Sequence, residues 1–214
     1  MDVSRVSLAS LTSTTHLDLP AFQFPPADPF ALASEWLARA LDRGVREPGT
    51  LALATADADG NPSSRFVLLK GFDARGLLFV SQASSRKGHD IAANPRASAS
   101  FYWQELRLQL HISGGVEKIP TKEADSIFAE RPISSRAVST ISHQGQDLLD
   151  EGKMNKEIGD LVSRGPKIAR PDRWTGYRIV PDRFEFWQGG ASRLHKRLEY
   201  NFSQEGWSWR RLQP

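Results

Sequence analysis

The polar and apolar positions of the first 27 residues follow neither a helical nor a strand period. They are rich in Ser and Thr and then in Pro ("LPAFQFPPADP"), so we expect residues 1–27 to be an extended arm that orders only by packing against something else. Asp28 followed by Pro29 is typical of a helix start. The helix is expected to end near Gly44. It should bury the face formed by Phe30, Ala33, Leu37, Ala40 and Leu41, with Trp36 beside it.

From residue 51 the pattern changes to short apolar runs separated by tight turns. The runs 51–57, 63–70, 77–82, 97–104 and 106–119 predict strands, and residues 175–214 are strand-rich again. In the fifth run, Leu106, Leu108, Leu110 and Ile112 fall on one face, opposite Arg107, Gln109 and His111. Strands joined by turns favour an antiparallel sheet, closed as a barrel, with helices at its periphery. We expect a single domain over residues 28–214.

Three further segments have helical character. One follows Ser85 and stops at Asn94-Pro95; the others cover 121–130 and roughly 147–163. The polar stretch between the last two, "RPISSRAVSTISHQGQ", is predicted to be a loop opened by Arg131.

Composition narrows the class of protein. The 214 residues carry 28 Lys+Arg against 25 Asp+Glu, a net charge of +3, which is too even to indicate general attraction to nucleic acid or membranes. Cysteine is absent, which excludes disulfides and thiolate chemistry. The five histidines lack metal-ligand spacing, so no metal site is expected. No apolar run is long enough to span a membrane and no signal peptide is evident, so the protein is expected to be cytoplasmic.

Positive side chains occupy unusual places in this pattern. Cations flank an apolar strand and stand at a strand-to-helix junction; they are Arg65, Lys70, Arg86 and Lys87. Near the end of the chain Arg193, His195 and Arg197 recur at period 2, so we expect all three to share one face of a strand. Such a set indicates an anionic, phosphorylated ligand. The alternative is that period-2 cations only mark the solvated face of a half-buried sheet. Spacing alone leaves both interpretations open and does not give the reaction.

Longer blocks identify a resemblance. The segments "SRFVLLKGFDARGLLFVSQASSRKG", "NPRASASFYW", "RPISS" and "EFWQGGASRLHKR" resemble, in the same order, the pyridoxamine 5′-phosphate oxidase superfamily. The resemblance runs from about residue 28 to the C-terminus. It implies a mainly β fold: an FMN-binding split β-barrel, antiparallel and Greek-key-like, with peripheral α-helices. It also implies a homodimer with FMN at the subunit interface.

The resemblance assigns roles by position. The phosphate cradle of FMN would be Arg65 with the backbone of Phe66, Val67 and Leu68, together with Arg86 and Lys87. The remaining FMN contacts would be Val80, Ser81, Gln109, Gln144, Trp187 and Arg197. Substrate-side positions would be Lys70, Arg131, Ser135, Arg193 and His195, of which Arg193 and His195 are the predicted catalytic residues.

The departures concern the substrate. Ile127 stands where the pyridoxamine-phosphate enzymes have a phosphate-binding tyrosine, and a Ser/Thr-rich arm replaces their N-terminal Arg-x-x-Tyr. The arm, "VREPGTLALATADADGNPSSR" and the terminal "RLQP" are similar to the phenazine-biosynthesis flavin oxidases of the superfamily. This likeness implies an FMN-dependent oxidase that uses O2 on reduced (dihydro-, tetrahydro- or hexahydro-) phenazine carboxylates, small planar or tricyclic substrates. The alternatives are a pyridoxine/pyridoxamine 5′-phosphate oxidase and a non-catalytic flavin-binding module.

Overall fold

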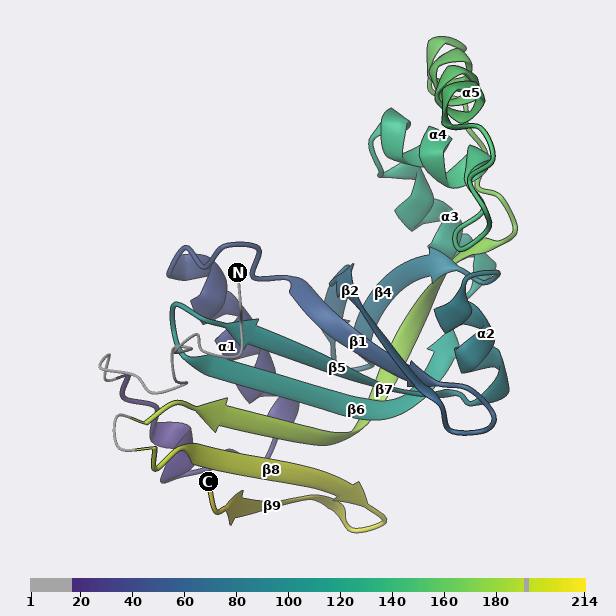
Figure 1. Cartoon of the computed structure of the whole chain (residues 1–214). Helices are drawn as coiled ribbons and strands as arrows, with labels where there is room; N and C mark the ends of the chain where they lie inside the picture. The colour runs from purple at the N-terminus through teal and green to yellow at the C-terminus, as the bar shows by residue number, and fades with distance from the viewer. Residues whose placement is uncertain (1–16, 191–192) are drawn as a thin grey trace, which may run out of the picture. The chain divides into compact units, whose positions relative to one another are not determined.

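A computed structural model of the chain describes residues 17–190 and 193–214. The chain divides into two compact units, which are described separately below. The first unit contains the described parts of Met1–Leu51, Ala99–Ile112 and Pro181–Pro214, and the second contains Ala52–Ser98 and Ser113–Val180. The limits between the two units fall inside several strands. Figure 1 labels the strands and helices named below. A single domain over residues 28–214 stays a prediction.

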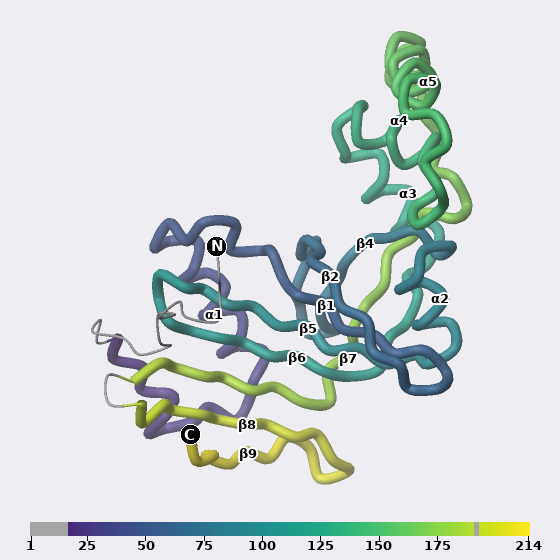
Figure 2. Tube along the Cα trace, in the orientation of Figure 1, coloured from purple at the N-terminus to yellow at the C-terminus, as the bar shows by residue number. Residues whose placement is uncertain are grey.

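The described residues form nine strands in one sheet, with the order β2-β1-β5-β6-β7-β4-β3 and with β8 and β9 continuing from β7. The pairs β3–β4, β4–β7, β7–β8 and β8–β9 are antiparallel. Figure 2 lets the reader follow β7 alongside the much earlier β4. The bounds are β1 Thr50–Ala56, β2 Pro62–Leu68, β3 Gly71–Asp73, β4 Gly76–Gln82, β5 Arg96–Trp103, β6 Leu108–Lys118, β7 Trp174–Gln188, β8 Lys196–Ser203 and β9 Gly206–Leu212.

The mainly β, antiparallel fold is therefore confirmed, but the expectation of a closed sheet is wrong. The order ends at β2 and β3 without a pair that joins them. The physical reason lies in the end strands: β3 offers only three residues for pairing, and β2 has no fully buried residue. Leu68 ends β2, so Lys70, which we expected inside the strand, follows it and donates its backbone N–H to Leu78 O.

The helices are η2 Pro20–Phe22, α1 Pro29–Asp42, α2 Arg86–Ala93, α3 Thr121–Ala129, α4 Ile133–Ile141 and α5 Glu151–Ser163. None in the described part of the chain is long and apolar enough to cross a membrane. α1 begins as predicted, with Asp28 Oδ1 accepting from Phe30 N at 2.9 Å. Its buried face is rotated from the predicted one: Leu41 is 65% exposed and Trp36 is fully buried. Trp36 takes the core position because its ring packs on Phe22 and Phe186 within the first unit.

Helix α4 replaces the predicted loop. Pro132 precedes it with an extended backbone, as a proline before a first helical turn can. Ile133, Ala137 and Ile141 recur every four residues and give this Ser-rich segment a helical apolar stripe, of which Ala137 is fully buried. Serines and two cations surround this stripe, so the segment has the composition of a loop.

Charged side chains cover one part of the sheet in the first unit. Glu199 on β8 is 3% exposed and accepts hydrogen bonds from Arg183, Arg210 and Asn201 at 2.7–3.0 Å. Burial acts to raise the pKa of Glu199, but these hydrogen bonds outweigh it and lower the pKa to about 2. Each buried carboxylate here is thus compensated by guanidinium groups.

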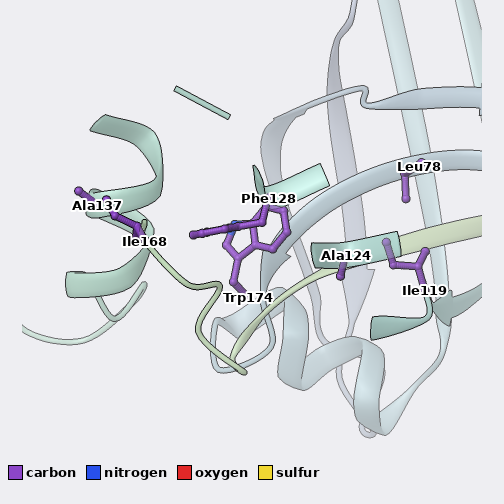
Figure 3. Close-up of a cluster of buried hydrophobic side chains, with 7 residues drawn as sticks. All are labelled: Leu78, Ile119, Ala124, Phe128, Ala137, Ile168 and Trp174. Atoms are coloured by element: carbon purple, nitrogen blue, oxygen red, sulfur yellow. The ribbon is translucent and has the colours of Figure 1, made fainter. Parts of the chain in front are cut away.

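In the second unit, side chains from β4, α3, α4, β7 and the segments next to them form an apolar cluster (Figure 3). Its members are Leu78, Ile119, Ala124, Phe128, Ala137, Ile168 and Trp174. Phe128 and Trp174 meet edge to face, with ring centroids 5.0 Å apart. Gly176 adjoins the cluster: a Cβ there would lie 2.4 Å from Ile119 Cδ1 and 3.0 Å from its Cγ1.

We therefore expect Gly176→Ala to lower the free energy of unfolding by about 1–3 kcal/mol, because Ile119 is 5% exposed and has no room to move aside. Gly115→Ala in β6 is the matched control, since a Cβ at Gly115 meets nothing within 4 Å. Urea unfolding of both variants measures the difference. Equal stabilities would show that the contact at Gly176 does not constrain the packing.

Candidate functional site

A cleft of about 440 Å³ opens in the second unit, a size suited to a small-molecule ligand. It brings together residues from β2, β4, α2 and α4 and from the segments next to them. Its lining consists of Arg65, Phe66, Val67, Leu68, Lys70, Val80, Ser81, Gln82, Lys87, Arg131, Val138, Ser139, Ser142, Gln144 and Trp174. Ten of these are residues to which the sequence assigned a cofactor or substrate role.

Lys87 is the most unusual side chain in the cleft, because it is a buried cation with only neutral partners. It is 6% exposed, and its Nζ donates to Ser81 Oγ at 3.0 Å, Ser85 Oγ at 3.3 Å and Gln144 Oε1 at 3.1 Å. No carboxylate in the described residues pairs with it. Burial lowers the pKa of Lys87, and the positive charge of Arg65 lowers it further. The ammonium group of Lys87 therefore lacks a negatively charged partner.

The fold places Lys87 at a helix start. Ser85 caps α2, its Oγ accepting from Gly88 N at 3.3 Å, so the positive end of the helix dipole lies at the same place. A helix N-terminus with adjacent cations is a common way for proteins to bind phosphate. The two cations in "SSRKG" thus differ: Lys87 lines the cleft, whereas Arg86 is exposed and does not.

Arg65 is the second cation at this end of the cleft. Its guanidinium donates to Leu53 O at 3.2 Å, to Thr55 Oγ1 at 2.7 Å and to Ser63 Oγ. Burial lowers the pKa of Arg65, while Asp90 acts to raise it. The guanidinium is held in one orientation rather than free in solvent.

Gln144 reaches the cleft because Gln82 holds the loop that carries it. Gln82 is 6% exposed; its Oε1 accepts from Gln144 N at 3.0 Å and its Nε2 donates to Ser142 O at 2.8 Å. Arg173 also donates to carbonyls of this loop, those of Thr140 and Ser142. A loop held at this many points can present Gln144 to a ligand with little reordering.

The other end of the cleft combines a cation with aromatic surface. Arg131 Nη1 donates to Ser139 Oγ at 2.8 Å, and its Cζ lies 5.1 Å from the Trp174 ring centroid. Burial lowers the pKa of Arg131. On β2, Phe66 is 77% and Leu68 56% exposed, although both are large apolar side chains. Such a lining suits a flat, apolar ligand that carries negative groups.

Five of the predicted site residues belong to the first unit. Gln109 Oε1 lies 3.2 Å from His111 Nε2, and Arg197 pairs with Glu185 Oε1 at 2.7 Å. Trp187 packs on His195, with centroids 4.7 Å apart, and His195 Nδ1 accepts from Gly190 N.

The expectation that Arg193, His195 and Arg197 share one strand face is wrong. β8 begins at Lys196, and Arg193 has a positive φ of 60° in the bend before it. The bend forms because Arg193 N donates to Gly190 O and His195 N to Arg193 O, which interrupts the extended backbone that period 2 assumes. Only Arg197 of the three lies in the strand.

Sequence reasoning missed five lining residues: Gln82, Val138, Ser139, Ser142 and Trp174. Val138 and Ser139 lie in α4, Ser142 follows it, and Gln82 ends β4. The sequence pattern predicted neither α4 nor which residues lie next to the end of β4. A polar residue that ends a strand next to a cation motif, as Gln82 does, is the signal that was available. Ser135, predicted to face substrate, lies on α4 but does not line the cleft.

Comparisons with known proteins now define the class. A model of the pyridoxamine 5′-phosphate oxidase family matches residues 37–158. A model of the pyridoxine 5′-phosphate oxidase C-terminal dimerisation region matches residues 174–214, which supports dimerisation. The chain belongs to the pyridoxamine 5′-phosphate oxidase family, a family of oxidases.

Individual relatives refine this. The chain is 39% identical over 205 residues to dihydrophenazinedicarboxylate synthase of Pseudomonas chlororaphis, covering 96% of this chain and 92% of the relative. It is 46% identical over 189 residues to pyridoxine/pyridoxamine 5′-phosphate oxidase of Bordetella petrii, covering 88% and 90%. The crystal structure of PhzG from Burkholderia lata, in complex with tetrahydrophenazine-1-carboxylic acid, matches with a TM-score of 0.92 and 36% identity over 94% of this chain and all of that one. The resemblance identified in the sequence, to a PhzG-type member of the superfamily with a split-barrel fold, is confirmed.

The buried charge of Lys87 predicts a pH dependence. An anion beside Lys87 would raise its lowered pKa, so binding would take up a proton wherever the free protein has lost it. The affinity for FMN, the cofactor that the resemblance implies, should then fall as pH rises through the pKa of Lys87 in the free protein, by up to about tenfold per pH unit. Titrations of flavin fluorescence at a series of alkaline pH values measure this.

Lys87→Met is the control, because it keeps most of the apolar stem and removes the charge. It should bind FMN about 10–100-fold more weakly near neutral pH and lack this part of the pH dependence. An identical alkaline slope in the variant and the parent protein would contradict the assignment of the effect to Lys87.

Proposed function

We propose that the protein is an FMN-dependent oxidase that oxidises reduced phenazine carboxylates with O2 in phenazine biosynthesis. In the proposed active form it is a homodimer with FMN at the subunit interface. The phosphate would be held by Lys87 and Arg65 at the start of α2, with Ser81, Gln144 and the β2 backbone lining the same cleft. The family resemblance also assigns FMN contacts to Gln109, Trp187 and Arg197, which stay proposed cofactor residues.

The observation that carries the proposal is the buried, uncompensated charge of Lys87. A lysine that is 6% exposed and bonded only to hydroxyls and an amide carbonyl costs free energy unless an anion joins it. A second cation, Arg65, lowers the pKa of Lys87 further, although Asp90 balances part of the charge of Arg65. A phosphate monoester supplies the missing charge and several acceptor oxygens, so the residues present fit the phosphate of FMN.

When bound, FMN supplies a two-electron acceptor that takes hydride from the substrate and is reoxidised by O2 with formation of hydrogen peroxide. The chain's own residues supply binding and orientation. The apolar surface that a tricyclic ring needs is present in the cleft and is formed by Trp174, Phe66, Leu68 and Val138. Oxidation restores aromaticity to such a ring, so little acid–base assistance is required.

The carboxylate of the substrate needs a cationic partner. Arg131 lines the cleft and is already oriented by Ser139 and the face of Trp174, so it would lose little conformational freedom on binding. Lys70 lines the same cleft. These two residues are the proposed carboxylate anchors.

His195 has a defined tautomer when neutral. Its Nδ1 accepts the Gly190 N–H, so the ring proton sits on Nε2, and packing on Trp187 fixes the plane of the ring. His195 would therefore donate from Nε2 to an acceptor on the substrate. Arg193, in the bend beside it, is the second proposed catalytic residue.

Pyridoxine/pyridoxamine 5′-phosphate oxidase activity is the second candidate. The 46% identity to the Bordetella petrii enzyme supports it, and Lys70 and Arg131 could receive a phosphate instead of a carboxylate. Against it stands Ile127, which packs on the apolar cluster and offers no hydrogen bond to a substrate phosphate. A non-catalytic flavin-binding module is the third possibility.

One assay separates the three. Purified protein, loaded with FMN, is offered a tetrahydrophenazine carboxylate or pyridoxamine 5′-phosphate under air, with loss of substrate and O2 consumption recorded. We expect the phenazine precursor to be consumed with kcat/KM at least about 100-fold higher, a discrimination of roughly 3 kcal/mol. The reverse preference would identify a vitamin B6 enzyme, and consumption of neither substrate would leave only a binding protein.

A further inference from the structure

Asp90 is a buried carboxylate in α2 that no role described so far uses. It is 4% exposed, and its Oδ2 accepts from Thr55 Oγ1 at 2.6 Å and from Ser63 Oγ at 2.7 Å. The Nη2 atom of Arg65 lies 3.7 Å from the same oxygen, beyond hydrogen-bond distance. Asp90 therefore forms an ion pair with Arg65 but is joined to it by hydrogen bonds only through the two hydroxyls.

Each of the two hydroxyls lies between Asp90 and Arg65, and this fixes the direction in which its O–H bond points. Each has one proton, and an ionised carboxylate is an acceptor only, so both protons point at Asp90. Their oxygens then accept from Arg65, whose Nη1 donates to Thr55 Oγ1 and whose Nη2 donates to Ser63 Oγ. If the carboxylate were absent, either hydroxyl could turn its proton toward the guanidinium and repel it.

The ionised state of Asp90 follows from its surroundings. Burial acts to raise the pKa of Asp90, but hydrogen bonds from Ser63 and Thr55, followed by the charges of Arg86 and Arg65, outweigh it and lower the pKa below the ordinary value. The carboxylate form that sets the hydroxyl polarity is thus present at neutral pH.

Arg65 has N–H donors that its hydrogen bonds to the described residues do not use. Of its five N–H bonds, Leu53 O, Thr55 Oγ1 and Ser63 Oγ take three. Within residues 17–190 and 193–214, the Nε–H and one Nη2 hydrogen have no hydrogen-bond partner. Arg65 lines the cleft. A guanidinium held on one edge and open on another is arranged to receive a second anion.

We propose that Asp90 is a positioning residue for the cofactor phosphate: acting through Thr55 and Ser63, it holds Arg65 with its remaining donors available to the phosphate. This inference rests on the proposed FMN site. It also links the two sides of that site, because Asp90 and Lys87 lie on the same helix, whereas Arg65 lies on β2.

Charge alone predicts the opposite effect, which makes the proposal testable. A carboxylate near a phosphate repels it, so if Asp90 only balanced charge, removing it would tighten FMN binding. If Asp90 orients Arg65, removing it weakens FMN binding. Because Arg65 would contact the phosphate and not the ring, riboflavin, which lacks the phosphate, should be unaffected.

The experiment measures dissociation constants of FMN and riboflavin for the apoprotein by fluorescence titration. We expect Asp90→Ala to weaken FMN roughly 10–100-fold and riboflavin by less than about twofold. Asp90→Asn can still present one oxygen to both hydroxyls, so its loss should be smaller, roughly threefold to tenfold. In an Arg65→Ala background, Asp90→Ala should change FMN affinity by less than about twofold, since the group through which it acts is gone.

Asp57→Asn is the matched control, because Asp57 is a half-buried carboxylate that lies in the field of Arg86 and forms no ion pair with Arg65 among the described residues; FMN affinity should stay within about twofold. Tighter FMN binding by either Asp90 variant, equal losses for FMN and riboflavin, or full additivity with Arg65→Ala would overturn the proposal. If Asp90→Ala does not fold, Asp90→Asn and Ser63→Ala carry the same comparison. Failure of the parent protein to prefer FMN over riboflavin would instead refute the proposed cofactor site.

Discussion

The second unit is organised around the buried ammonium group of Lys87, with which no carboxylate among the described residues pairs. Lys87 has three hydrogen bonds but only neutral partners, and Arg65 stands near enough to lower its pKa. Burying an unpaired cation is unfavourable, and a fold retains one where a ligand completes it. The cap of α2, the loop carrying Gln144 and the cleft itself are all consistent with an anion at this place. The stability of the site is thereby tied to its occupancy.

Around that charge the chain uses neutral groups and one acid to fix geometry. Gln82 and Arg173 hold the loop that carries Gln144, and Asp90 polarises two hydroxyls that hold Arg65. At the opposite end, Arg131 lies over Trp174 next to exposed apolar side chains. One end of the cleft therefore suits a phosphate and the other a planar ring with a carboxylate. This division is consistent with a family whose relatives are named for different substrates.

The sequence predicted the strands closely, because alternation such as that of Leu106 to Ile112 follows directly from burial of one sheet face. The family resemblance assigned ten of the cleft residues to the site, whereas the pattern of the chain alone singled out only the cations among them, such as Lys87. The pattern failed where neighbours distant in the chain decide. The buried face of α1 depends on the packing of Trp36 against the distant Phe186. The open sheet depends on the short β3 and the exposed β2, and the bend at Arg193 depends on its hydrogen bond to Gly190; alternation of apolar residues encodes neither. Asp90 escaped notice because its partners, Thr55 and Ser63, precede it by 35 and 27 residues.

The most direct test of this account is a crystal structure of the protein grown with FMN. The account predicts phosphate oxygens within about 3.2 Å of both Lys87 Nζ and the Arg65 guanidinium, at the N-terminus of α2. It would be contradicted by a bound flavin whose phosphate lies elsewhere while Lys87 keeps only its neutral partners.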